Sequence, residues 1–153
     1  MKPTAVSQKS TYRSLREPFT KFVAERAIDG NLETFSQTIC AWDYEHWYKL
    51  KFDALYCFST IVIINQHTRL QFAHRIDDTK VFVVNSLEET EFTCGVIKVS
   101  NVSTLERQTY RIPCHGKCGD EVKLTLEHWS GKHSHVACIN MKEIKAFQGK
   151  LLS

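Results

Sequence analysis

The sequence Asp29-Gly30-Asn31 could hold a hard cation such as calcium. Glycine adopts positive φ without steric cost, and Asp and Asn side chains can hydrogen-bond to their own backbone, so the chain turns sharply here. Such a turn can direct a carboxylate and several backbone carbonyls toward one point, and oxygen atoms are the ligands that Ca²⁺ prefers. The same residues also suffice for a tight turn without metal. The sequence leaves both interpretations open.

Six cysteines are a second group with defined chemistry. An even number of widely spaced cysteines is typical of disulfide-bonded extracellular domains, although the pairing does not follow from the sequence. Zinc is the alternative, because Cys114 and Cys118 are followed by His133 and His135. Their spacing is not that of a standard zinc finger, and disulfides already account for the cysteines. We therefore favour disulfides.

No recognised catalytic motif is present in the sequence. It contains no Gly-x-Ser-x-Gly, no phosphate-binding glycine-rich loop and no His-Glu-x-x-His. Cysteines held in disulfides cannot act as nucleophiles. The sequence therefore predicts a binding protein and not an enzyme.

Length and composition exclude several classes of protein. The chain has 153 residues and 42% hydrophobic residues, enough for one domain with its own core. Its net charge of +3 is small and scattered, which argues against nucleic acid as a partner. The longest apolar run, residues 59–65, is too short for insertion into a membrane. Asn101-Val102-Ser103 is an N-glycosylation sequon, which adds slight support for an extracellular glycoprotein.

Short runs of β-branched and aromatic residues predict an all-β fold. Residues 60–64 and 81–84 show no alternation, so we expect strands buried on both faces. Residues 122–127 alternate, which predicts a strand with one face in water. Two more strands are expected at 109–112 and within 136–147, whereas residues 13–26 could form a loop or one short helix. Strands separated by turns are typical of an antiparallel sandwich or jelly roll.

The order of three segments resembles the F-type lectins (fucolectin, tachylectin, pentraxin-fusion), a branch of the discoidin-like, galactose-binding-domain-like jelly rolls. Residues 2–12 are similar to the opening stretch of that family, residues 27–31 to its calcium loop, and residues 47–50 to its tryptophan strand. The resemblance extends over nearly the whole chain. It implies a single disulfide-stapled jelly-roll domain spanning residues 1–153. Because Met1-Lys2-Pro3 lacks a signal peptide, we expect a piece of a longer secreted protein, or of a membrane protein's ectodomain.

The resemblance also implies disulfide pairs. The family's two bridges correspond to Cys40 with Cys138 and Cys94 with Cys114, which leaves Cys57 and Cys118 to pair by elimination. Each bridge would stabilise the fold by about 3–5 kcal/mol by constraining the unfolded chain. The adjacent Cys-Cys pair near the family's sugar site is absent here.

The calcium site that the resemblance implies is incomplete. Asp29 matches the family's carboxylate, and the backbone carbonyls of Arg26, Asn31 and Cys138 match other ligands. Ile39 stands where a hydroxyl is expected, although Thr38 is one residue away, and Ile139 replaces a glutamate. The lost carboxylate removes one or two of the roughly 6–8 oxygens that Ca²⁺ prefers. A bound calcium ion and a metal-free turn therefore remain equally open.

The sugar site also departs from the family pattern, in which a histidine and two basic residues bind fucose. Arg75 corresponds to the second basic residue, but Gln66 stands where the first should be. His46 is the only candidate for the histidine and lies too far along the chain. Cationic donors suit sugars because each can hydrogen-bond to neighbouring hydroxyls. We expect weak fucose binding or none, and an altered ligand.

Other residues extend this predicted binding surface. Trp42 could stack on the apolar face of a sugar, whereas Trp47 corresponds to the family's core tryptophan. His67 belongs to the loop 65–78, which is expected to present the ligand. The sequence thus favours an extracellular lectin-like module that binds a glycan or glycoprotein. The alternative is a domain that has lost sugar binding and contacts an extracellular protein.

Overall fold

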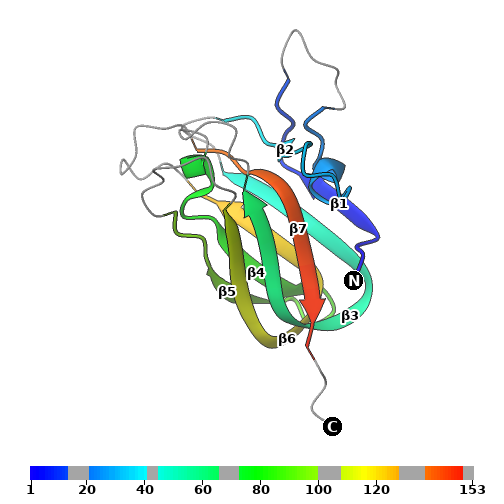
Figure 1. Ribbon diagram of the computed structural model, residues 1–153. Helices are drawn as coiled ribbons and strands as arrows, with labels where there is room; N and C mark the ends of the chain where they lie inside the picture. The colour runs from blue at the N-terminus through cyan, green and yellow to red at the C-terminus, as the bar shows by residue number, and fades with distance from the viewer. Residues whose placement is uncertain (14–20, 41–44, 66–72, 100–107, 128–136, 150–153) are drawn as a thin grey trace.

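A computed structural model describes residues 1–13, 21–40, 45–65, 73–99, 108–127 and 137–149. The structure is an antiparallel all-β fold with very little helix, as the sequence predicts (Figure 1). In chain order the elements are β1 (Ala5–Gln8), the 3-10 helix η1 (Ala24–Ala27), β2 (Ser36–Gln37), β3 (His46–Asn65), the 3-10 helix η2 (His74–Ile76), β4 (Lys80–Asn85), β5 (Thr90–Val96), β6 (Thr109–Leu126) and β7 (Asn140–Gln148).

Two long strands, β3 and β6, hold the sandwich together. They contain 20 and 18 residues and pair with each other along most of their length. The first half of β3 also pairs with β1 and its second half with β7, while the second half of β6 pairs with β4. Bulges interrupt the β3–β6 register, and bulges bend strands. Both strands therefore contribute to both halves of the sandwich, in the order β2-β7-β3-β6-β4-β5.

One hydrophobic core fills the space between the two halves. Ile61 and Ile63 of β3 are fully buried in it, and Val62 between them is buried too but is not part of this core cluster, which confirms the buried strand predicted at residues 60–64. The prediction for residues 81–84 was wrong in one respect, because β4 alternates. Val81 and Val83 are fully buried, whereas Phe82 is only half-buried, with Lys123 Nζ 5.3 Å from the centre of its ring. The aliphatic stem of a lysine can cover such a ring without entering the core.

Of the two neighbouring aromatics at the start of β3, Tyr48 and not Trp47 lies in the core. Tyr48 is fully buried between the inward-facing His46 and Leu50, so alternation turns Trp47 to the other face of the strand. There Trp47 is half-buried, and Lys49 Nζ lies 4.8 Å from its ring centre. The buried hydroxyl of Tyr48 donates to the carbonyl of Ala24 at 2.7 Å and so ties η1 to the sandwich.

The region predicted as a loop or short helix contains η1 (Ala24–Ala27), a single short 3-10 helix. Of its other residues, 14–20 lie outside the described part of the chain. Within the described ranges, no helix is both long enough and apolar enough to cross a membrane.

Candidate functional site

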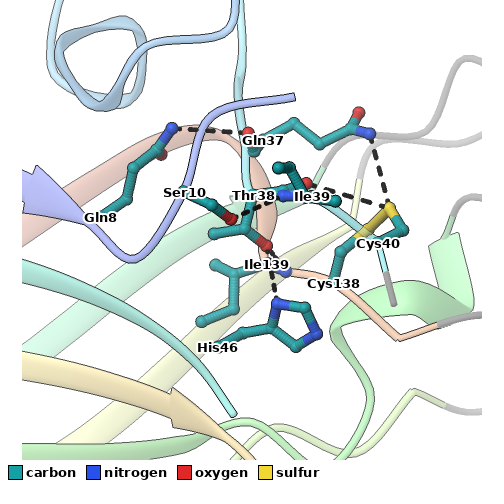
Figure 2. Close-up of a disulfide and its surroundings, with 9 residues drawn as sticks. All are labelled: Gln8, Ser10, Gln37, Thr38, Ile39, Cys40, His46, Cys138 and Ile139. Atoms are coloured by element: carbon teal, nitrogen blue, oxygen red, sulfur yellow. Dashed lines mark hydrogen bonds between the residues drawn. A yellow bond between two sulfur atoms is a disulfide. The ribbon is translucent and has the colours of Figure 1, made fainter. Parts of the chain in front are cut away.

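Three disulfides connect the strands, and all three pairs match the expectation from the sequence. Cys40–Cys138 joins the segment after β2 to the segment before β7 (Figure 2). Cys94–Cys114 links β5 to β6, and Cys57–Cys118 links β3 to β6. The zinc alternative is excluded for its two cysteines, because Cys114 and Cys118 are both bonded to other sulfur atoms. The candidate zinc ligands His133 and His135 lie outside the described residues, as does the sequon at Asn101.

His46 lies in the core and not on a ligand-binding surface. Its side chain is fully buried, and Nδ1 lies 3.2 Å from the hydroxyl of Thr38 (Figure 2). The same hydroxyl accepts a hydrogen bond from the backbone N–H of Ile139 at 3.0 Å. This network joins the ends of β2, β3 and β7 directly beneath Cys40–Cys138. His46 is thus buried in this structure, whereas the expectation from the sequence required it at a ligand-binding surface.

Arg75 lies at the same end of the sandwich, on η2. Its backbone carbonyl accepts a hydrogen bond from the N–H of Cys138 at 3.2 Å, so its main chain is fixed against the disulfide. Burial lowers the pKa of the Arg75 guanidinium from its ordinary value, and the nearby Tyr12 opposes this shift. A guanidinium stays protonated and offers a planar set of donors. Arg75 can therefore bind vicinal hydroxyls or a carboxylate.

The segment between β1 and η1 adds an exposed surface to this end. Thr11, Arg13 and Ile39 line a shallow depression, and the backbone N–H of Ile39 donates to Ser10 Oγ at 3.0 Å. Ile39 is 43% exposed and Tyr12 39% exposed, so both offer apolar surface to a ligand. An aromatic ring, an aliphatic side chain and two arginines thus lie at this end of the sandwich. We call Tyr12, Arg13, Ile39 and Arg75 the disulfide-side surface.

Sequence reasoning did not assign Tyr12 and Arg13 to the site. They belong to the opening stretch of the chain, far in sequence from Arg75, and only the folded structure brings them near it. Of the other expected ligand contacts, Trp42, Gln66 and His67 lie outside the described residues.

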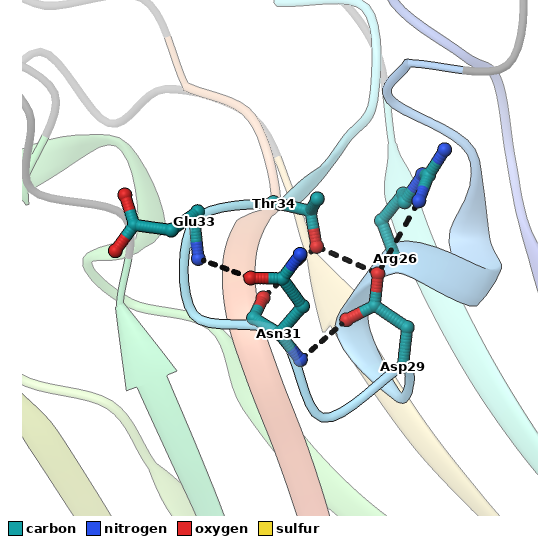
Figure 3. Close-up of polar contacts among 5 residues, drawn as sticks. All are labelled: Arg26, Asp29, Asn31, Glu33 and Thr34. Atoms are coloured by element: carbon teal, nitrogen blue, oxygen red, sulfur yellow. Dashed lines mark hydrogen bonds and ion pairs between the residues drawn. The ribbon is translucent and has the colours of Figure 1, made fainter.

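The candidate calcium loop is closed by its own hydrogen bonds (Figure 3). Asp29 Oδ1 accepts from the N–H of Asn31 at 2.9 Å, and Oδ2 accepts from the hydroxyl of Thr34 at 2.6 Å. The guanidinium of Arg26 lies 3.5 Å from the same Oδ2. The backbone carbonyl of Asn31 accepts from the backbone N–H of Thr34 at 3.2 Å and lies 2.9 Å from the hydroxyl oxygen of the same residue. Asp29 thus caps the turn, with its side chain only 23% exposed.

Strand β7 contributes two charged side chains to this loop. Lys142 Nζ donates to the backbone carbonyl of Leu32 at 2.8 Å. Burial raises the pKa of the Glu143 carboxyl from its ordinary value of 4.5; Lys145 and the N–H of Gly30 act against this rise, and Asp29 adds to it. Glu143 Oε2 has no hydrogen-bond partner within the described structure, so it could offer one oxygen to a cation.

Taken together, these groups do not fit a calcium ion. Both carboxylate oxygens of Asp29 already accept hydrogen bonds. The hydroxyl of Thr38 is already hydrogen-bonded to the ring of His46 and to the N–H of Ile139. The carbonyl of Leu32 already accepts a hydrogen bond from the ammonium group of Lys142. Ca²⁺ requires about 6–8 converging oxygens. Within the described residues, no three or more His, Cys, Asp or Glu side chains are grouped to hold a metal.

Comparison with solved structures defines the class of fold. No protein-family model matches the sequence, and no curated protein matches it. The structure nevertheless has the fold of the discoidin-like carbohydrate-binding modules. A family 32 module from Clostridium perfringens NanJ, solved with galactose, aligns with a TM-score of 0.65 and 16% identity over 93% of this chain and 91% of that one.

F-type lectins share the fold too, as the sequence resemblance implied. The fucolectin from striped bass (Morone saxatilis) serum aligns with a TM-score of 0.69 and 19% identity over 94% of this chain. This chain spans about half of the fucolectin, 46% of its length. A fucose-binding module from Streptococcus pneumoniae gives a TM-score of 0.69 and 18% identity over 95% of this chain and 94% of that one. At such identities the likeness establishes the fold alone.

Proposed function

We propose that this chain is an extracellular, non-catalytic recognition module that binds a glycan or glycoprotein with non-standard specificity. The single observation that carries the proposal is the position of Arg75. It is half-buried on η2, and its backbone is fixed to Cys138 beside a disulfide. Structural neighbours that bind Lewis b antigen, galactose and GalNAc-β-1,3-galactose support a glycan as the ligand.

The disulfide-side surface offers the two kinds of contact that a sugar needs. Arg75 and Arg13 can donate paired hydrogen bonds to neighbouring hydroxyls or to the carboxylate of an acidic sugar. Tyr12 and Ile39 are exposed and can cover the apolar face of a pyranose ring with little loss of side-chain entropy. With two cations and no acidic side chain among its four residues, this surface favours neutral or acidic glycans over basic ligands.

The specificity differs from that of a fucose lectin because His46 is not exposed. The family pattern needs a histidine at the sugar, and here the imidazole is fully buried beside Thr38. A glycan must therefore be held by a different set of donors. Three disulfides, which persist in oxidising compartments, support an extracellular location.

A glycan array with the purified chain tests the proposal. We expect binding to one class of glycan, with the signal strongly reduced in Arg75→Ala and reduced almost as far in Arg75→Lys, which keeps the charge but loses the planar fork. Arg111→Ala is the matched control, because Arg111 is an exposed arginine on β6. Its binding should equal that of the wild type. Wild-type binding by Arg75→Ala would place the site elsewhere on the domain.

An extracellular protein partner is the second candidate function. The exposed Ile39 and Tyr12 favour it, because aromatic and aliphatic side chains are common at the centres of protein interfaces. A negative glycan array, followed by loss of binding to a cell-surface protein on Ile39→Asp substitution, would support this function over the first.

A further inference from the structure

The loop containing Asp29 lies along strand β7 just beyond the short strand β2. β2 pairs with β7 only through Ser36 with Met141 and Gln37 with Asn140. The next residue of β7, Lys142, contacts the loop through its side chain instead of through strand pairing. The loop is thus fastened to β7 by a charged side chain, at the place where pairing with β2 has stopped.

Lys142 is an unusual residue for its position. Only 7% of its surface is exposed, and it reaches a backbone carbonyl 110 residues away in the sequence. Burying an ammonium group is costly unless it is hydrogen-bonded or paired, so Lys142 requires an acceptor such as Leu32 O. The bond to Leu32 therefore stabilises both the lysine and the loop.

Arg26 supplies a second positive charge within the loop itself. Its guanidinium lies 3.5 Å from Asp29 Oδ2, the oxygen that also accepts the hydroxyl of Thr34 (Figure 3). A divalent cation placed in this loop would have to displace Thr34 or Arg26 from Asp29, and would be repelled by the ammonium of Lys142 at Leu32. A metal ion would place positive charge beside the Asp29 carboxylate and would bind a carbonyl of the loop. Arg26 already supplies that charge, and Lys142 already binds the carbonyl of Leu32.

We propose that two side-chain cations make the loop 26–34 independent of calcium: Lys142, which fastens the loop to β7, and Arg26, which pairs with Asp29 inside the loop. This inference concerns the support of the domain and does not depend on which ligand the disulfide-side surface binds. The two cations also explain how the loop keeps its conformation in this chain, where Ile39 and Ile139 stand at positions at which the F-type lectins have oxygen ligands.

The test combines metal titration of the wild type with two substitutions. Thermal unfolding of the wild type should give the same Tm in millimolar CaCl₂ and in excess chelator, and calorimetric titration with CaCl₂ should show no binding heat. Lys142→Met should lower the Tm by about 4 °C or more in both buffers, because the loop carbonyl loses a charged donor. Arg26→Gln should lower it by less, since Arg26 is more exposed.

Lys51→Met is the matched control, because Lys51 is an exposed lysine in β3 with no contact to the loop among the described residues. Its Tm should stay within about 1 °C of the wild type. A wild-type Tm that rises clearly with calcium, or saturable heat on calcium titration, would overturn the inference even if Lys142→Met fails to fold. A Lys142→Met protein as stable as the wild type would overturn it equally.

Discussion

The hydroxyl of Thr38 lies 3.2 Å from Nδ1 of His46, in the interior of the sandwich. It also accepts the N–H of Ile139, so one hydroxyl connects the segments that flank β2, β3 and β7. Both Thr38 and His46 are fully buried. The pair therefore positions the Cys40–Cys138 disulfide and, through it, the base of the disulfide-side surface.

Thr38→Val should lower the free energy of unfolding by about 1–3 kcal/mol. Valine has a similar shape, but it leaves the N–H of Ile139 and a nitrogen of His46 without their buried partner. Urea unfolding followed by tryptophan fluorescence measures the change. Thr109→Val, at an exposed position in β6, is the control and should change stability by less than about 0.5 kcal/mol. Equal effects of the two substitutions would contradict the role assigned to Thr38.

Removal of the disulfides should destabilise the domain in the order of the loops that they close. Cys40–Cys138 spans 98 residues and Cys94–Cys114 spans 20. A disulfide constrains the unfolded chain more when it closes a longer loop. The expected stabilisation is about 5 kcal/mol for Cys40–Cys138 and about 3 kcal/mol for Cys94–Cys114. Double Cys→Ala variants of each pair, compared by urea unfolding, should show the larger loss for Cys40–Cys138. The reverse order would mean that strain or packing outweighs chain entropy in this fold.

The sequence predicted the strands better than it predicted which faces they bury. In β3 the neighbouring aromatics Trp47 and Tyr48 have similar strand propensity, and a shift of one residue exchanges the two faces of a strand. The alternation of His46, Tyr48 and Leu50 favours Tyr48 as the inward residue. The pattern is recognised only if a histidine is accepted as a core residue. No local property of His46 reveals its partner, because Thr38 lies eight residues earlier in the chain, just after β2.

Lys142 shows a similar limit, although here a signal was available. Charged residues are costly inside a buried strand, and Lys142 and Glu143 stand between the apolar residues Met141 and Ile144. Such an interruption indicates that partners must exist nearby. Their identity depends on the path of the loop 26–34 over β7, which the fold determines and local sequence does not.

Tyr48 should make the stability of the domain depend on pH in the alkaline range. Burial raises the pKa of its hydroxyl well above the ordinary value of 10.0, and Glu25 and Glu143 add to the rise. The unfolded chain therefore releases this proton first, so the contribution of Tyr48 is complete below about pH 10 and is lost as the pH rises further.

Tyr48→Phe isolates this effect. At pH 7 it should lower the free energy of unfolding by about 1 kcal/mol, because the carbonyl of Ala24 loses its donor. The difference from the wild type should shrink between pH 10 and pH 11, since phenylalanine does not titrate. Urea unfolding across this range measures both values, and a difference that stays constant with pH would contradict the assigned shift.

L-Fucose should bind this chain more weakly than about 1 mM, or not at all. The reason is structural: the only histidine that sequence suggested for the sugar is His46, and its ring is fully buried. Exposing the ring would break its contact with Thr38 and open the core below Cys40–Cys138. The free energy lost in this way exceeds the free energy that one hydrogen bond to a sugar contributes. Isothermal titration with L-fucose is the measurement, with the pneumococcal fucose-binding module as positive control. A dissociation constant near 1 μM would show that another residue takes the place of the histidine, and His46→Gln would then distinguish a rearranged core from a new site.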